Sequence, residues 1–344
     1  MGLGRRIAFR IIQAIGRSVT SFGYSICLAE LIISPAMPSA TARGGGVFYP
    51  IVQSLSSAFD SEPGPTARRI GKYLLQVGFH ADAVTCMMFL TSMAGNPLCV
   101  GLAASAVGVE LTWMQWAVAA IVPGLVCLLL VPLVLLRIAP PEIRQIPNAR
   151  QIARDELEKM GSMSRDELVL PFVFLICLVL WATGSLTGLG ATPIAMLAVS
   201  IMLIAGVLTW KDILAEKGAW DAMFWMGGLM ALATALSKSG FIKWAAAFIA
   251  DGIAGAHMGW ISSFLIISLI YIYSHYCFAS VTARIFANLP ISLTHYGNGA
   301  APVYFGAGYV SQSEWWRNGF IVCTVNTVVW LTVGMARWKL IGLW

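Results

Sequence analysis

The sequence predicts an all-α polytopic membrane protein, and three observations carry that prediction. Apolar residues make up 58% of the chain and charged residues only 11%, with a mean hydropathy of +0.77, whereas soluble domains carry about 25% charged residues. Residues 117–136 contain no charge and are long enough to cross the ~30 Å hydrocarbon core as a helix. Further apolar runs occupy 170–185, 193–209, 220–236, 259–280 and 319–336. A large soluble core would need polar faces on most of these helices, and the runs lack such faces.

The positive charges predict which ends of the helices face the cytoplasm. The net charge is +6, but the basic residues lie between apolar runs and form no aromatic-laced stripe, which argues against nucleic acid as a partner. By the positive-inside rule the basic segments are cytoplasmic. These segments hold Arg5, Arg6, Arg10 and Arg17, then Arg68, Arg69 and Lys72, then six Lys or Arg between 137 and 165.

Two further features exclude other classes of protein. The seven cysteines show no paired spacing and lie mostly inside apolar runs, so we expect packing residues, with no disulfide framework and no zinc site. No nucleophile, metal cluster or nucleotide loop appears, so we expect neither an enzyme nor a bound cofactor. The first 29 residues hold four arginines and no acid, a composition shared with transit peptides. Without a clear cleavage site they predict a cytoplasmic-side amphipathic helix and favour a bacterial inner membrane over a plastid envelope.

The chain repeats itself. The hexapeptide PSATAR at 38–43 returns as ASVTAR at 279–284, and Gly95-Asn96-Pro97 returns as Gly297-Asn298-Gly299. Each Gly-Asn element is followed about twenty residues later by a tryptophan pair and then by an apolar helix, 117–136 or 319–336. The pairs are Trp113 with Trp116 and Trp315 with Trp316. We therefore expect a first repeat over 1–136, a cytoplasmic linker over 137–168 and a second repeat over 169–344.

Gly, Pro and Asn at matching places in two apolar halves indicate the discontinuous helices of a secondary transporter. Unpaired backbone groups cannot face lipid, so such breaks survive where they line a site enclosed by protein. We expect re-entrant hairpin tips at 38–46 and 279–284, a broken helix over 73–112 and a broken element over 294–306. Four helix ends would then converge near the membrane midplane.

Helix ends and short polar side chains suit a carboxylate. Helix N-termini present free N–H groups and the positive end of the dipole. For a single Ser or Thr, hydrogen bonding to its own helix is the simpler interpretation, but repetition of the pattern beside an arginine favours substrate binding. The candidate ligands are the hydroxyls of Ser39, Thr41, Ser280 and Thr282 and the amides of Asn96 and Asn298.

Arg43 and Arg284 directly follow the two tips. A charge at mid-membrane costs at least about 2.5–3.5 kcal/mol, so it indicates a function by default. We expect both arginines to attract a dianion; the alternative is that each pairs with a fixed acid such as Glu30 or reaches water. Other polar residues in apolar stretches favour hydrogen-bonded structural roles over proton carriage, namely Glu30, His80, Asp82 and His275.

The motifs quoted above, together with FLTSMAGNPL, AIVPGLV, SHYCFASVTAR, LTHYGNGAAPVYFGAGYV and the closing WKLIGLW, resemble the divalent anion/sodium symporter (DASS) family over nearly the whole chain. The likeness is to the branch of bacterial citrate and tartrate:succinate exchangers and plastid 2-oxoglutarate/malate translocators. It implies a dimeric inverted-repeat transporter, with scaffold helices and a transport domain that moves as an elevator. It also implies di- and tricarboxylate substrates, held by Ser-Asn-Thr signatures at the two tips.

Carried over by position, Ser39 and Thr41 match the first signature, in which Ala40 replaces the usual Asn. Ser280 and Thr282 match the second, with Val281 between them, and Arg284 stands where relatives carry His. Asn96 and Pro97 match the first broken helix and 294–302 the second. The loss of a donor at Ala40 predicts a weaker site by about 1.5–3 kcal/mol.

The second half is shorter than the first. Between Arg43 and Asn96 lie 52 residues, but between Arg284 and Asn298 only 13, which as a helix cover about 20 Å. We therefore expect the return arm of the second hairpin, and the N-terminal scaffold that relatives carry, to be absent.

The sequence thus predicts secondary transport of di- or tricarboxylates of the malate, succinate, citrate and 2-oxoglutarate class by anion exchange, in a homodimer if the site is intact. The arginines near the tips would replace a coupling cation. Two alternatives stay open: a symporter that uses a sodium ion, and a shortened remnant that transports nothing.

Overall fold

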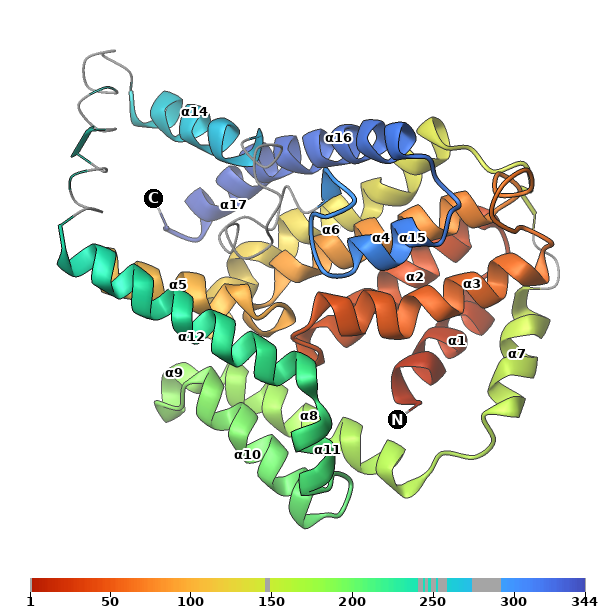
Figure 1. Cartoon of the computed structure of the whole chain (residues 1–344), viewed down its shortest axis with the longest axis horizontal. Helices are drawn as coiled ribbons and strands as arrows, with labels where there is room; N and C mark the ends of the chain where they lie inside the picture. The colour runs from red at the N-terminus through yellow and green to blue at the C-terminus, as the bar shows by residue number, and fades with distance from the viewer. Residues whose placement is uncertain are drawn as a thin grey trace.

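The computed structural model describes residues 2–145, 149–240, 244, 247–248, 252, 259–273 and 292–343, and these residues are organised as helices (Figure 1). In the described part of the chain no β-strand occurs; an isolated bridge joins Ser18 to Gln145. The prediction of an all-α protein with several apolar helices is confirmed.

The first part of the chain contains α1 (Leu3–Ile15), α2 (Val19–Ile33), η1 (Ser34–Ala36), η2 (Thr41–Phe48), α3 (Tyr49–Ala58), α4 (Gly71–Met88), η3 (Leu90–Ser92), α5 (Gly95–Val107) and α6 (Trp113–Ile138). The middle contains α7 (Ala149–Lys159), α8 (Arg165–Ala182), α9 (Gly184–Thr187), α10 (Ala191–Ile204), α11 (Trp210–Ala215) and α12 (Lys217–Lys238). The rest contains α14 (Trp260–Tyr273), α15 (Ala301–Gly306), α16 (Gln312–Val329), η7 (Trp330–Gly334) and α17 (Met335–Leu340).

Among the described residues, three helical stretches are long and apolar enough to cross a membrane: Val19–Ala36, Trp113–Ile138 and Gln312–Leu340. The predicted spans 117–136 and 319–336 lie inside the last two. The helices α10 and α14 are apolar but shorter. Apolar side chains such as Phe172, Leu175 and Met196 are exposed on α8 and α10, as expected for helices that face lipid.

The helix α4 is the centre of the molecule. Every residue of α4 except Lys72 is buried, and α2, α3 and α6 pack around it. From the second half, Tyr304 of α15 packs on Phe79 of α4 with ring centroids 5.8 Å apart, and Figure 1 shows α15 in front of α4. Polar α4 side chains, Gln76, His80, Asp82 and Thr85, are therefore enclosed by protein.

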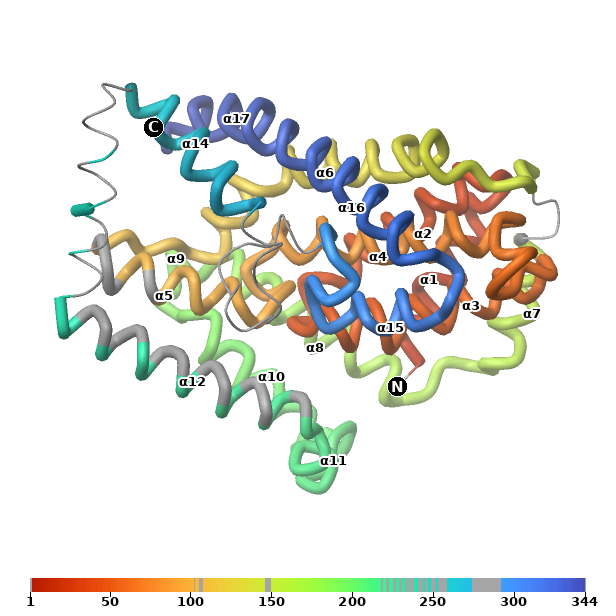
Figure 2. The backbone as a smooth tube through the Cα atoms, turned by 45° about the horizontal axis from the view of Figure 1, so that its top comes forward, coloured from red at the N-terminus to blue at the C-terminus, as the bar shows by residue number. Residues whose placement is uncertain are grey.

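The two long membrane helices α6 and α16 run antiparallel. Near the end of the chain, Arg337 Nε donates to Val118 O at 3.4 Å and Trp338 Nε1 donates to Ala119 O at 3.1 Å, so α17 lies beside the start of α6 (Figures 1 and 2). Both helices begin with a reciprocal capping box, Thr112 with Gln115 and Ser311 with Glu314.

The basic segments meet at one end of the molecule. Backbone N–H groups of Glu142 and Ile143 donate to Arg68 O and Arg69 O at 3.0 Å, and Val19 N donates to Arg144 O at 3.3 Å. At that end Lys72 Nζ lies 2.8 Å from Glu314 Oε1. The helix α6 therefore ends where α16 begins. The three basic segments that are predicted to be cytoplasmic lie at this same end of the molecule.

Candidate functional site

The first hairpin tip is an interruption between α2 and α3. The chain passes through η1, leaves helical geometry at Met37–Ser39 and resumes as a π-helical turn, η2, that continues into α3. Ser39 starts the new helix because its Oγ accepts a hydrogen bond from Ala42 N at 3.2 Å. Ser39 therefore makes the bond to its own helix that is the simpler interpretation for a single serine. The bond uses the oxygen as acceptor, so the proton of the exposed Ser39 hydroxyl stays available to another acceptor.

The second interruption separates α4 from α5. The chain is extended at Phe89 and Met93, with η3 between them. Asn96 is buried, and its Nδ2 donates to Cys86 O at 2.8 Å and to Phe89 O at 3.0 Å. Ser92 Oγ donates to the same carbonyl of Cys86 at 2.8 Å. Asn96 thus satisfies carbonyls that the end of α4 leaves open.

The third interruption, from Thr294 to Ala300, precedes α15. Asn298 is buried, and its Oδ1 accepts from Ala301 N at 2.7 Å, which caps α15. Its Nδ2 is also buried and has no hydrogen-bond partner among the residues that the structure describes. An unpaired buried amide is costly, so this N–H is a donor available to an acceptor that the described residues do not supply.

The first tip lies against the third interruption. A Cβ atom built on Gly299 would overlap Thr41 Oγ1, and one built on Gly44 would lie 3.1 Å from Ala300 Cβ and 3.2 Å from Asp82 Cγ. The structure therefore brings Thr41 together with the segment that carries Asn298. Thr41 is exposed at this junction, and the exposed Ser39 precedes it by two residues. Asn96 lies at the end of α4.

Arg43 is enclosed and bonded on every side. Its Nε lies 2.8 Å from Glu30 Oε2, and its Nη2 lies 2.7 Å from Asp82 Oδ1. Its Nη1 donates to Met37 O at 2.8 Å and to Ser92 O at 2.9 Å. All three charged side chains are 0% exposed. Arg43 thus joins the first interruption to the second, and it pairs with Glu30, which is the alternative to a direct role in attracting the dianion.

The second tip at 279–284 lies outside the described residues, and with it Ser280, Thr282 and Arg284, as well as His275. The site described here therefore consists of the first tip and the interruptions beside Asn96 and Asn298.

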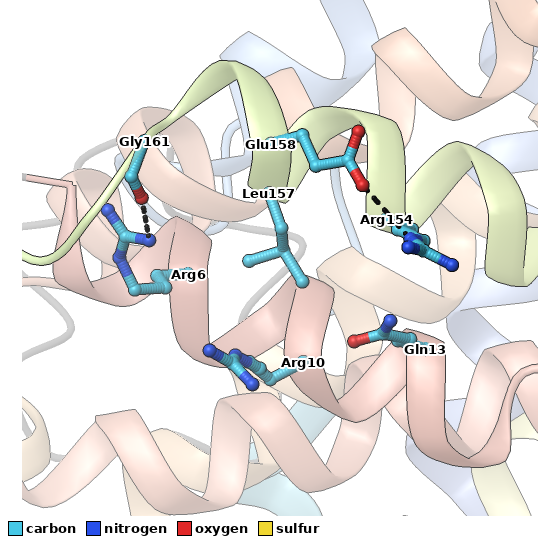
Figure 3. Close-up of a pocket in the computed structure, with 7 residues that line it drawn as sticks. All are labelled: Arg6, Arg10, Gln13, Arg154, Leu157, Glu158 and Gly161. Atoms are coloured by element: carbon cyan, nitrogen blue, oxygen red, sulfur yellow. Dashed lines mark hydrogen bonds and ion pairs between the residues drawn. The ribbon is translucent and has the colours of Figure 1, made fainter.

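A separate hollow of about 390 Å³ lies between α1 and α7 (Figure 3). It is lined by Arg6, Arg10, Gln13, Arg154, Leu157, Glu158 and Gly161. The hollow is basic, but two of its arginines form ion pairs with acidic side chains. Arg6 pairs with Glu167 at 3.0 Å and Arg154 with Glu158 at 3.0 Å. No residue of the tip or of the interruptions lines it, so it is a different feature from the candidate site.

Comparison with known proteins gives one family for the whole chain. The family model described as the sodium:sulfate symporter transmembrane region matches residues 1–294 and 291–344. YflS of Bacillus subtilis (strain 168), provisionally named a malate transporter, is 43% identical over 371 aligned positions. Dicarboxylate transporter 1, chloroplastic, of Spinacia oleracea is 41% identical, and the inner membrane protein YbhI of Escherichia coli (strain K12) is 34% identical.

The relatives are longer than the chain. The whole chain aligns in all three comparisons, but it covers only 65% of the spinach transporter and 77% of each bacterial relative. The alignments with YflS and the spinach protein contain 371 positions, 27 more than the 344 residues of the chain. At least that many positions of these relatives have no counterpart within it.

Proposed function

The chain belongs to the divalent anion/sodium symporter family, and from that membership we propose that it carries di- or tricarboxylates of the malate, succinate, citrate and 2-oxoglutarate class across a membrane by exchange. The family consists of transporters, in agreement with the prediction that the chain is not an enzyme. The chain is a multi-pass integral membrane protein. An inner-membrane location is supported by its relative YbhI, which is named an inner membrane protein.

One observation carries the substrate proposal: the unpartnered Asn298 amide beside the contact between Gly299 and Thr41. A carboxylate only accepts hydrogen bonds, and each bond to a charged acceptor is worth about 1.5–3 kcal/mol. The Asn298 N–H, the Thr41 hydroxyl and the Ser39 hydroxyl are donors at one junction. Asn298 would supply the kind of donor that is missing at Ala40.

Asn96 and Arg43 have other roles in this proposal. Both N–H bonds found for Asn96 go to carbonyls at the end of α4, so Asn96 holds the interruption in shape. Arg43 is occupied by Glu30 and Asp82, so it positions the tip and does not bind the substrate directly. The second tip would complete the site with Ser280 and Thr282, and Arg284 would supply positive charge.

The antiparallel course of α6 and α16 supports the inverted-repeat architecture. Each helix follows a Gly-Asn interruption, begins with a capping box and carries two tryptophans within its first five residues. Helices that occupy equivalent places in the two repeats should point in opposite directions when the repeats are inverted. The dimer implied by the family is part of the same proposal.

Transport is tested with radiolabelled malate, citrate or 2-oxoglutarate in proteoliposomes of the purified chain, loaded with succinate or left empty, with and without sodium. Uptake into loaded vesicles alone supports exchange. Uptake into empty vesicles that needs sodium supports the symporter alternative. A folded chain that takes up nothing under any condition supports the remnant alternative, which the 27 unmatched positions favour.

A further inference from the structure

The cluster of Glu30, Arg43 and Asp82 is short of one positive charge. Its two carboxyl groups share one guanidinium, and all three side chains are 0% exposed. Among the described residues the other buried charged side chains are Arg6 and Glu167, which pair with each other. With both acids ionised, the cluster would carry a net charge of −1 inside the protein.

The groups around the cluster do not neutralise that charge. From α4, Thr85 Oγ1 lies 3.5 Å from Glu30 Oε2, and Cys86 Sγ lies 3.1 Å from Arg43 Nη2. The one lysine of the surrounding elements, Lys72 on α4, pairs with Glu314 at 2.8 Å. The remaining titratable groups of α2, α3, α4 and α15 are thiols, phenols and one imidazole, namely Tyr24, Cys27, Tyr49, Tyr73, His80 and Tyr304. None of them is a basic side chain that pairs with either acid.

Each acid also has an oxygen without a partner. Glu30 Oε1 and Asp82 Oδ2 are buried and accept no hydrogen bond from the part of the chain that the structure describes. A bare carboxylate oxygen in such surroundings is costly, and two carboxyls that share a site do not both ionise readily. A proton on one of them removes the excess charge and uses one of the unpaired oxygens.

We propose that Glu30 and Asp82 together bind one exchangeable proton beside Arg43. The proton comes from water and bonds to one carboxylate oxygen, which makes the three-residue cluster neutral. Because Asp82 and Ala300 both lie beside Gly44, the cluster adjoins the junction proposed for the substrate. The proton site then has a role in transport, which rests on the proposed function. The neutral cluster admits a dianion, whereas the deprotonated cluster repels it.

Infrared difference spectra of the purified chain in lipid, recorded during a pH titration, test the proton without any transport. The carbonyl stretch of a protonated carboxylic acid should be present at neutral pH and bleach as the pH rises. In Glu30→Gln and in Asp82→Asn it should be lost at neutral pH, because the remaining acid has Arg43 to itself. The exposed acid Glu158 is the matched control, and Glu158→Gln should keep the band.

Absence of the band from the wild-type chain at every pH at which it stays folded overturns the proposal, as does its persistence in both variants. Loss of the band on addition of sodium at constant pH keeps the proton site but overturns its role in transport, because the pair then holds sodium in place of the proton. If a variant does not fold, as judged by its tryptophan fluorescence, the wild-type pH titration decides whether a carboxyl group is protonated. The addition of sodium to the wild-type chain decides whether sodium replaces that proton.

The transport consequence is measured separately as the pH dependence of exchange. The wild-type and Glu158→Gln rates should fall as the band bleaches, whereas Glu30→Gln and Asp82→Asn should lose that dependence. Wild-type exchange that stays constant while the band bleaches overturns the transport role. A wild-type chain with the band but no exchange contradicts the proposed function and keeps the proton site.

Discussion

Gly299 of the second half lies directly against Thr41 of the first tip, so closely that no side chain fits between them. These residues belong to different repeats of the sequence, and their contact is where two interruptions of helices meet. Asn298, with its unpartnered Nδ2, immediately precedes this contact. A residue without a side chain is therefore required where the first tip and the third interruption approach each other.

Replacement of Gly299 by alanine should reduce transport more than stability. The added methyl group would overlap Thr41 Oγ1, and the threonine would have to turn or move away. We expect at least a tenfold loss of exchange with the thermal unfolding temperature lowered by only a few degrees. Gly306→Ala is the control, because a Cβ there meets nothing within 4 Å. Equal exchange by the two variants would show that the contact does not matter.

Thr41→Val tests the hydroxyl with little change of shape. Loss of one hydrogen bond to a carboxylate costs about 1.5–3 kcal/mol, which corresponds to roughly ten- to hundredfold in affinity. The half-saturating substrate concentration should rise accordingly, as measured by exchange at graded malate concentrations. Thr332→Val is the control, since Thr332 Oγ1 bonds to Val328 O of its own helix at 2.6 Å. Unchanged half-saturation in Thr41→Val removes Thr41 from the site.

Asn298→Asp separates the two functions of this amide. The variant keeps an oxygen that can accept from Ala301 N, so α15 retains its cap. It replaces the unpartnered N–H by a negatively charged acceptor, which repels a carboxylate. We expect the Asn298→Asp chain to fold but not to bind substrate. Binding is measured as the rise in unfolding temperature that malate causes. Asn298→Ala should lose both the cap and the donor. Stabilisation of Asn298→Asp by malate would contradict the assignment.

The helical membrane class and the longest spans could be predicted because a long uncharged apolar run is visible in the sequence itself. The uncharged run 117–136 falls inside α6, and 319–336 falls inside the Gln312–Leu340 stretch. Lipid excludes charge and unpaired backbone wherever a helix lies in the fold, so composition alone identifies such helices. The family resemblance rested on longer motifs and is confirmed by the comparisons.

The bonding within the site could not be predicted in the same way. The sequence identifies Asp82 as a polar residue in an apolar stretch, but nothing local connects it with Arg43, whose Nη2 lies 2.7 Å from Asp82 Oδ1. Asn96 lies ten residues from Cys86, and its role at the carbonyls of α4 depends on how the interruption folds back. The capping pairs at Thr112 and Ser311 were signals present in the sequence, because a hydroxyl three residues before Gln or Glu indicates a helix start.

Arg43→Gln should be the most destabilising of these changes. It leaves Glu30 and Asp82 buried without their cation and removes the bonds to Met37 O and Ser92 O. Breaking a buried pair costs about 3–5 kcal/mol, while an exposed pair is worth at most about 1 kcal/mol. Thermal unfolding in detergent should show a large loss relative to Arg154→Gln, whose exposed pair with Glu158 serves as control. Adding Glu30→Gln and Asp82→Asn should restore part of the stability, because no charge is then buried in this cluster. A triple variant less stable than Arg43→Gln would show that the arginine acts through its bonds to the backbone and not through its charge.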